Sequence, residues 1–434
     1  MRLGRGTKYD TLMLYLFYVL AGFSIYVNQN NSIYGTFVFV FMAMLSISKK
    51  FVYTLPVIFV ANDALGTAVL GNVSFYWAAL VLVIVHKLFY QSSRISRPAG
   101  ILAAVGMLYC FQLWVVQYSW EIREPLRTLM FICLAVFLVD ELSKKRADYQ
   151  EVFKYFGISV FLVAIHMALT GGIDYSVYGY EGSGGSWIRT SRFGLLGTGI
   201  GDPNFSSMRL LFGAVCLFCS DIKRVIKYPM ILLLIYCIAR TVSLTGVIML
   251  VGMIGVIIFL KQGIARKIKI ISTVLVSVSF GIFLLNYLPL GDLNEQMDLL
   301  RYRVENSVSS FLADDMNSLT SGRAGATTDN LNYALGRGNL GLLFGGEAIP
   351  APGTNLSHNT YVDCLVRYGL IGLAAIVWLM VSRLISAYKI HLKRNSQVTA
   401  NVVAIKVLYL AYCFTLSIYN GPDLALISMF MFVM

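Results

Sequence analysis

Charged side chains are scarce in this sequence. They make up 13% of its 434 residues, whereas soluble domains carry about 25%. Hydrophobic residues reach 57%, and apolar runs of about 17–25 residues, long enough to cross a bilayer, recur from Thr11 onwards. This composition excludes an ordinary soluble protein. It predicts an all-α polytopic membrane protein with about 12 to 14 transmembrane helices.

Several signatures of common chemistry are missing. Carboxylates are scattered and D-x-D does not occur, and there is neither a P-loop nor a G-x-S-x-G elbow. The seven cysteines lie almost entirely in apolar runs, which argues against a disulfide framework and a zinc site. The net charge of +13 belongs to short loops, as in membrane proteins generally. We therefore expect no metal, no cofactor and no nucleic-acid partner.

The apolar runs leave only two long polar stretches outside them. We expect one integral membrane domain, 1–434, with a smaller outer loop at 171–204 and a large outer loop, with short helices, at 289–358. No cleavable signal peptide is evident, since the first apolar run is one of many. The predicted spans cover 11–27, 33–48, 51–70, 73–90, 99–117, 126–140, 152–170, 205–220, 227–240, 242–260, 268–288, 359–382, 401–418 and 423–434.

Lysine is absent from every second loop, and this predicts the orientation. With the N-terminus in the cytoplasm, every lysine falls inside or at an inner helix end, as expected from the excess of cations in cytoplasmic loops. Both termini are then cytoplasmic, and both long loops face outward. The outer side receives arginines instead: Arg123, Arg127, Arg189, Arg192, Arg209, Arg240, Arg301, Arg303, Arg323, Arg337 and Arg367.

An outer surface with arginine and no lysine favours an anion site. Guanidinium is permanently charged and planar, and it offers paired donors to phosphate or carboxylate. The alternative is that single arginines pair with outer acids such as Glu121, Glu124 and Asp363, or extend to the membrane interface. Arg240 lies between two apolar spans, where a charge needs a partner or a water-filled cavity, so it is a functional candidate.

Both outer loops carry local order signals. Asp292 and Glu295 form a capping-box pattern, and apolar residues then recur at helical spacing, which predicts an amphipathic helix over 292–312 along the membrane surface. A short helix is expected at 329–335. In the smaller loop, glycines and aromatics are typical of a flexible, sugar-stacking surface, and the step into Pro203 predicts a helix start.

Histidine is rare, and His358 is the only one of four in the large loop, at the start of a predicted helix. It is the natural proton acceptor near neutral pH, and a helix N-terminus would favour its neutral form and help to hold an anion. The alternative is a structural histidine that caps its helix. Asp63, inside the third span, is a second candidate base or a counter-ion for Arg240.

Three stretches between 189 and 372 stand out by the order of their parts. They are Arg192 ahead of GLLGTGIGDPNFSS, then Ser321-Gly322-Arg323, and finally Gly345-Gly346 with Ser357-His358-Asn359-Thr360-Tyr361 and Gly369 to Gly372. These stretches resemble the family of O-antigen polymerases and ligases, with the related capsule polymerases of the Wzy type. One departure is that the family has Ser-Arg in the middle helix pair, whereas the arginine here is displaced by a few positions, to Arg240.

The resemblance implies glycosyl transfer from a polyprenyl-diphosphate-linked saccharide at the outer face of the bacterial inner membrane. The polymerase branch moves a growing chain to the non-reducing end of a new lipid-linked repeat unit, and the ligase branch moves a finished chain to lipid A-core. Neither branch needs a nucleotide sugar or a metal. The implied partners are the undecaprenyl-diphosphate-linked donor and acceptor, membrane lipid, a chain-length regulator and a flippase.

Within this resemblance we expect the polymerase reaction. Arg323 and Arg192, then Arg189 and Arg240, would hold the diphosphate and stabilise its developing charge. His358 would deprotonate the acceptor hydroxyl. The residues expected to bind sugar or support the site are Asn204, Asn359, Tyr361 and Asp63. The alternatives are the ligase and, from another class, a lipid-linked oligosaccharide flippase, which the long outer loop disfavours.

Overall fold

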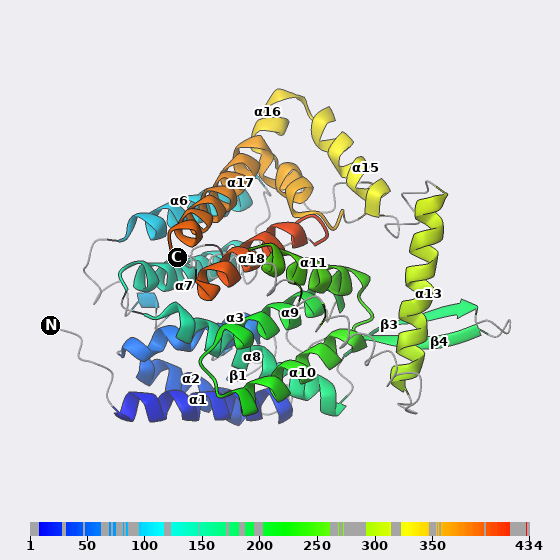
Figure 1. Cartoon of the computed structure of the whole chain (residues 1–434). Coiled ribbons are helices and arrows are strands. Elements are labelled where there is room, and N and C mark those ends of the chain that lie inside the picture. Colours follow the sequence, from blue (N-terminus) through cyan, green and yellow to red (C-terminus); the bar gives the residue numbers. More distant parts are fainter. Residues whose placement is uncertain are drawn as a thin grey trace.

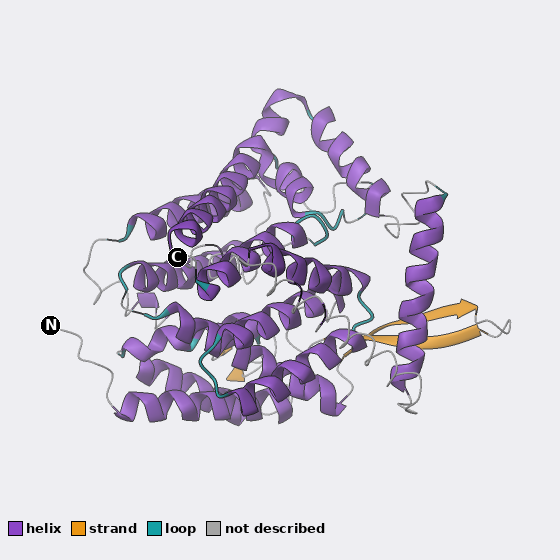
Figure 2. Cartoon of the chain, in the orientation of Figure 1, coloured by secondary structure: helices purple, strands orange, loops and turns teal. Residues whose placement is uncertain are grey.

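Helices dominate the structure (Figure 2), a computed structural model. Among the described residues, three helices are long and apolar enough to span a membrane: α1 (Lys8–Val27), α8 (Tyr149–Thr170) and α17 (Thr360–Arg394). The structure describes residues 8–27, 32–46, 48–61, 69–70, 73–74, 81, 84–85, 95–116, 123–145, 147–170, 173–181, 187–194, 203–260, 268, 272, 292–313, 323–346, 353, 355, 357–394, 396–416 and 431.

The other helices of the bundle coincide with predicted apolar spans. The predicted spans at 73–90, 268–288 and 423–434 lie almost wholly outside the described residues. The remaining bundle helices are α2 (Ser32–Leu45), the 3-10 helix η1 (Lys49–Tyr53), α3 (Leu55–Val60), α6 (Arg97–Val116), α7 (Arg123–Ser143), α9 (Pro203–Cys219), α10 (Arg224–Arg240), α11 (Leu244–Leu260) and α18 (Gln397–Tyr412).

The described residues of the large loop form three helices, α13 (Asp292–Leu312), α15 (Arg323–Gly336) and α16 (Gly338–Phe344). The amphipathic helix predicted at 292–312 is confirmed as a helix. The short helix predicted at 329–335 begins earlier, at Arg323, and its Thr327 and Asn330 side chains donate to the carbonyls of Ser357 and Asn355.

The all-α prediction omitted a β-hairpin in the smaller loop. There β3 (Ile173–Glu181) pairs antiparallel with β4 (Trp187–Gly194). Both segments are rich in aromatic and β-branched residues, which favour strands; the prediction gave their glycines more weight. Two short strands, β1 (Val69–Leu70) and β2 (Val73–Ser74), form a second small hairpin.

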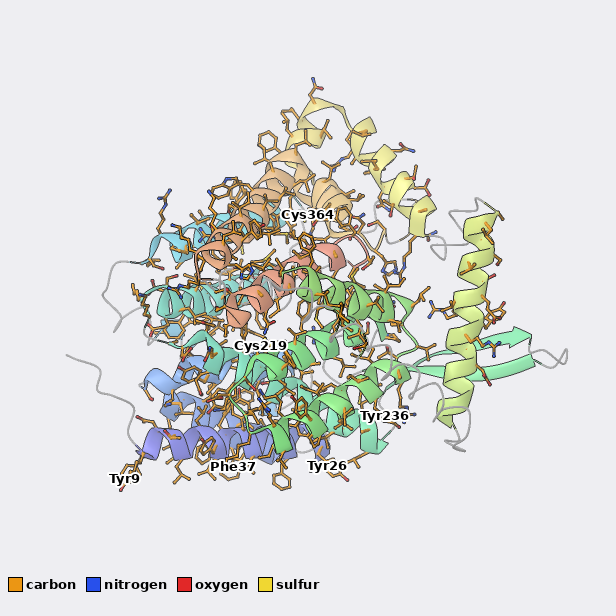
Figure 3. All side chains as sticks on the ribbon, in the orientation of Figure 1. Tyr9, Tyr26, Phe37, Cys219, Tyr236 and Cys364 are labelled. Atoms are coloured by element: carbon orange, nitrogen blue, oxygen red, sulfur yellow. The ribbon has the colours of Figure 1, made fainter. Side chains whose placement is uncertain are left out.

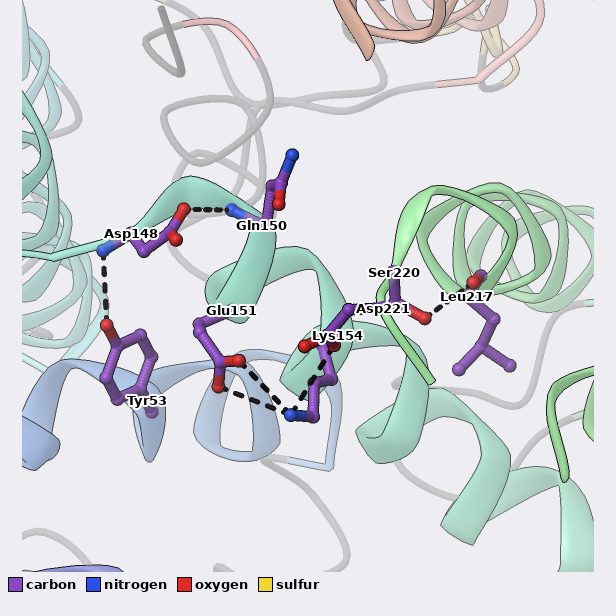
Figure 4. Close-up of polar contacts among 8 residues, drawn as sticks. All are labelled: Tyr53, Asp148, Gln150, Glu151, Lys154, Leu217, Ser220 and Asp221. Carbon is purple, nitrogen blue, oxygen red and sulfur yellow. Dashed lines mark hydrogen bonds and ion pairs between the residues drawn. The ribbon is translucent and has the colours of Figure 1, made fainter. Parts of the chain in front are cut away.

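The two ends of the bundle carry different cations. At one end, which we call the lysine end, Lys154 pairs with Glu151 (3.1 Å) and with Asp221 (3.6 Å), and so joins the start of α8 to the turn before α10 (Figure 4). The other end, which we call the arginine end, carries Arg240, and α10 separates it from Lys223 by about 25 Å.

Beyond the arginine end lie the β3–β4 hairpin and α13, which runs across the direction of the bundle helices (Figure 1). One lysine departs from the predicted pattern. Lys406 is fully buried within α18, where its Nζ donates a hydrogen bond to the Met431 carbonyl (2.5 Å).

The sides of the bundle expose large apolar side chains, as a lipid-facing surface would. Tyr9 and Tyr26 on α1 and Phe37 on α2 are 76%, 53% and 49% exposed, and they lie along one side in Figure 3. This exposure is compatible with a membrane protein.

Glycines allow α8 and α9 to pack closely in the core. A Cβ atom on Gly157 would lie 2.6 Å from Leu217 Cγ and 3.1 Å from the Leu217 backbone nitrogen. On the facing helix, a Cβ on Gly213 would lie 2.6 Å from Val160 Cγ1. This crossing positions the start of α9, and hence one part of the candidate site.

We therefore expect Gly157→Ala to destabilise the fold by about 1–3 kcal/mol, because it overpacks this crossing. The matched control is Gly252→Ala on α11, where a new Cβ would meet no described atom within 4 Å and alanine should gain up to about 1 kcal/mol in helix propensity. Thermal unfolding of the detergent-solubilised variants measures the difference. Equal midpoints for the two variants would contradict the crossing.

Candidate functional site

A buried polar cluster joins the starts of α9 and α11 at the arginine end. Ser243 Oγ donates to Asn204 Oδ1 (2.9 Å) and accepts from the Gly246 backbone N–H (3.2 Å). Asn204 and Ser243 are both buried. A Cβ on Gly246 would lie 2.7 Å from Ser207 Cβ, so the two helices touch at this point. Asn204, a predicted site residue, therefore ties two helices together.

Arg240 lies beside this cluster, as the last residue of α10. Its side chain is 9% exposed, its Nη1 donates to Tyr236 Oη (3.4 Å), and the guanidinium lies 6.0 Å from the Tyr236 ring centre. The turn that follows contains Val242 with φ of 47°. Arg303 of α13 donates to the Val242 carbonyl (2.6 Å). The turn that presents Arg240 is thus held from outside the bundle.

Arg189 and Arg192 lie on β4, opposite Gly179 and Ser176 of β3. The strand packs against α9 and α13, so its backbone lies at the arginine end, near the elements that carry Asn204 and Arg303. Asp63, expected to act as a base or as a counter-ion for Arg240, lies outside the described residues.

A second group forms around the segment that carries His358. Ser357 Oγ donates to Asp363 Oδ1 (2.6 Å) and accepts from the Asn359 N–H (3.1 Å). Asp363 is fully buried in the first turn of α17. From α15, Thr327 Oγ1 donates to the Ser357 carbonyl (3.1 Å). His358 therefore lies between two residues whose positions are fixed.

His358 itself has φ of 51°, in the left-handed region that residues other than glycine rarely adopt. Such strain persists only where the surrounding contacts impose it, and it is common at functional sites. His358 is partly buried, and its backbone is held in this conformation at the arginine end. A general base must lie within hydrogen-bond reach of the proton that it accepts, and a fixed backbone favours this.

The helix cap at this position is Asn359. Its Oδ1 accepts the N–H groups of Tyr361 (3.0 Å) and Val362 (3.3 Å), and the Thr360 N–H donates to the Cys413 carbonyl (2.8 Å). The alternative in which His358 caps α17 is therefore wrong. The suggestion that this helix start holds an anion also fails, because its first N–H groups are already used within the protein.

Arg323 and the start of α17 meet at the end of α18. Arg323 Nη1 lies 3.4 Å from the Thr415 carbonyl, to which it donates. The Thr360 hydroxyl donates to the Leu416 carbonyl, and Tyr361 Oη to the Leu410 carbonyl (3.2 Å). Arg323 and His358 thus belong to segments anchored on the same few residues of α18.

The end of α18 also connects the two groups. It packs against α9 and α11, and the rings of Phe212 and Tyr412 lie 6.0 Å apart. The buried cluster at Asn204 and the segment at His358 therefore share α18 as a neighbour. The structure brings Arg323, His358, Asn359 and Tyr361 together, and Arg240 with Asn204.

Other outer arginines make contacts within the protein. Arg209 is buried and donates to the Val60 carbonyl (3.1 Å), whereas Arg301 pairs with Glu305 (3.0 Å) and is 79% exposed. For Arg301, the interpretation as a surface ion pair is confirmed. In the described part of the chain, no group of three or more His, Cys, Asp or Glu residues could hold a metal ion.

Sequence reasoning missed three residues of this region. Asp363 was considered only as a partner for arginine, whereas it accepts from Ser357. Ser243 carried no signal beyond its place between two spans. Asn330 is fully buried on α15, and its Nδ2 donates to the carbonyls of Ala326 (2.8 Å) and Asn355 (2.7 Å). The only sequence signal for Asn330 was the presence of an asparagine in a predicted helix next to a long loop.

Comparison of the sequence with models of protein families found no match, and comparison with curated proteins found none. The function must therefore be argued from the residues and from their geometry.

The positive φ at His358 predicts that glycine is more stable than alanine at this position, the reverse of the order within a helix. His358→Gly should be more stable than His358→Ala by about 1 kcal/mol, because an alanine Cβ is disfavoured at positive φ. The matched control is Asn306 on the exposed face of α13, where alanine should be favoured over glycine by about 1 kcal/mol. Thermal unfolding of the four variants gives both differences. The same sign at both positions would contradict the backbone conformation at His358.

Proposed function

We propose that this chain is a membrane glycosyltransferase that polymerises lipid-linked saccharide repeat units for a bacterial surface polysaccharide, an O-antigen or a capsule. It transfers the growing glycan from undecaprenyl diphosphate to the non-reducing end of a lipid-linked repeat unit. Its site faces the periplasm, and both termini are cytoplasmic, as the distribution of lysine favours.

One observation carries this proposal: a permanent cation and a histidine fixed in strained backbone share an anchor at the arginine end of an apolar bundle. Arg323 lies at the Thr415 carbonyl, and the helix after His358 is bonded to the Cys413 carbonyl. A leaving diphosphate needs a nearby cation, and an attacking hydroxyl needs a base. The lipid carrier of both substrates suits a site at a membrane surface.

The reaction is a single displacement. The acceptor hydroxyl oxygen attacks the anomeric carbon of the donor, its proton passes to His358, and the bond from the anomeric carbon to the phosphate oxygen breaks. The electron pair leaves with undecaprenyl diphosphate, whose developing charge Arg323 stabilises, with Arg192, Arg189 and Arg240 as further contributors. The anomeric centre inverts.

The nearest alternative is the ligase, which uses the same donor and transfers to lipid A-core. Disruption of the gene separates the two. Core bearing a single repeat unit indicates loss of a polymerase, whereas unligated polymer on the carrier indicates loss of a ligase.

A flippase is the alternative from another class. An assay of purified protein in vesicles with lipid-linked repeat units distinguishes a flippase from a transferase, because a ladder of products indicates glycosyl transfer. Transport of intact substrate without a ladder would overturn the proposal.

Arg323→Ala should reduce chain extension by about 100-fold or more, because a stabiliser of the leaving group is lost. Insertion into the membrane should remain normal, since the hydrogen bond from Arg323 Nη1 to the Thr415 carbonyl is long (3.4 Å). The control is Arg301→Ala, which removes an exposed ion pair and should leave the product ladder unchanged. The ladder formed by purified protein provides the measurement. Near-normal chain lengths for Arg323→Ala would refute this assignment.

His358→Gln should slow extension by about 100-fold or more, because a general base is removed. Initial rates of chain extension by the wild type and the variant test this expectation. An unchanged rate in the variant would transfer the role of base to a carboxylate such as Asp63.

A further inference from the structure

A break divides α17 into two parts. Gly369 has φ of 65° and ψ of −170°, which is not helical, inside the helix that runs from Thr360 to Arg394. The residues 360–368 therefore form a short helix of their own, which we call the half-helix. A helix end leaves its last carbonyl groups without an N–H partner four residues on. In an apolar setting those groups need other donors.

Two donors from outside the half-helix satisfy its free end. Arg337 Nη1 donates to the Val366 carbonyl (3.0 Å), and the Gly346 N–H donates to the Arg367 carbonyl (3.0 Å). Through Nη2, Arg337 also donates to the Gly345 carbonyl (2.9 Å). Its planar guanidinium thus bridges the half-helix and the end of α16. A lysine cannot reproduce this paired geometry.

The backbones touch at this bridge. A Cβ on Gly345 would lie 2.4 Å from the Arg367 carbonyl oxygen, and one on Gly369 would lie 2.3 Å from the Leu343 carbonyl oxygen. Only glycine fits at either position. The two glycines allow the backbones to approach closely enough for Arg337 to bond both the Val366 and the Gly345 carbonyls.

His358 lies just before the other end of the half-helix, two residues ahead of Thr360. From Thr360 to Val366 the half-helix rises about 9 Å. Alongside runs α15, which begins at Arg323 and ends just before Arg337. An apolar contact among Ala334, Leu365 and Val366 lies between them.

These two elements are joined at both ends. Near His358, α15 donates from Asn330 to the Asn355 carbonyl and from Thr327 to the Ser357 carbonyl. At the far end the link is Arg337. Hydrogen bonds thus connect α15 and the half-helix near both of their ends, and these bonds set the placement of Arg323 relative to His358.

We propose that Arg337 is a positioning residue that sets the placement of His358 relative to Arg323 from the far end of the half-helix. The expected loss of rate rests on the proposed function, whereas the fixed position of the half-helix rests on the contacts described above. Without the bridge the half-helix pivots about Gly369, and the imidazole moves away from the acceptor hydroxyl. A misplacement of about 1 Å can cost about 100-fold in rate.

Arg337→Lys tests this, since it keeps the charge and the apolar stem, and Arg337→Gln is a second variant in case the first folds poorly. The matched control is Arg301→Lys on α13. Hydrogen exchange should become at least about tenfold faster at Thr360–Asp363, because the amides of a helix that moves as a unit open together. Exchange in α9 should not change, and the control should match the wild type throughout.

The kinetic measurement uses the lipid-linked repeat units of the polymerisation assay. We expect kcat to fall at least about tenfold with little change in KM, because a positioning defect affects the transition state more than substrate binding. Faster exchange confined to the residues next to Gly345 and Val366, or an unchanged kcat in an active preparation, would overturn the inference.

Failure of the proposed function gives a different result. If wild-type protein forms no product ladder, the transferase proposal fails, and hydrogen exchange at Thr360–Asp363 still decides whether Arg337 fixes the half-helix.

Discussion

The need to satisfy backbone carbonyl groups in an apolar surrounding governs this structure. Inside a membrane-like bundle, continuous helices meet that need without outside help, and most of the described chain is helical. At several helix ends and breaks near the arginine end, an arginine side chain donates a hydrogen bond to a backbone carbonyl that has no helical N–H partner. The recipients are the carbonyls of Val60, Val242, Thr415, Val366 and Gly345, bonded by Arg209, Arg303, Arg323 and Arg337.

This constraint changes the meaning of the outer arginines. Their exclusive use first indicated an anion site, because guanidinium suits phosphate. The structure adds a second use of the same chemistry, since a planar group with five donors can bind a carbonyl and still present donors elsewhere. Arg337 donates to the carbonyls of Val366 (3.0 Å) and Gly345 (2.9 Å), and Arg323 donates to the Thr415 carbonyl (3.4 Å). The two bonds by which Arg337 joins the half-helix to the end of α16 are why we assign positioning to it.

The strain at His358 follows from the same packing. The neighbouring Ser357 and Asn359 are bonded to each other and to α17, so the residue between them has little freedom. Positive φ in a residue with a Cβ costs free energy that the local network must offset. A bonded network thus holds the backbone of His358 at the point where α15, α17 and α18 meet.

Composition and periodicity were sufficient to predict much of this protein. The apolar runs predicted the positions of the bundle helices, because a helix in an apolar setting must bury its own backbone groups. The capping pattern at Asp292 predicted α13, since a helix start is encoded by neighbours in the sequence. The sequence also drew attention to Arg323 and His358, because rare polar residues in an apolar chain are conspicuous.

Other features depend on contacts between residues far apart, and only the tertiary structure decided them. The cap at Asn359, the bond from Ser357 to buried Asp363 and the bridge by Arg337 each require a partner that local sequence does not specify. The β3–β4 hairpin was missed because its glycines favour a loop, while pairing across the two strands decides the outcome. The sequence by itself determined which residues could do chemistry. The tertiary structure decided which of them meet, because the carbonyl groups at helix ends accept hydrogen bonds from residues that are far away in the sequence.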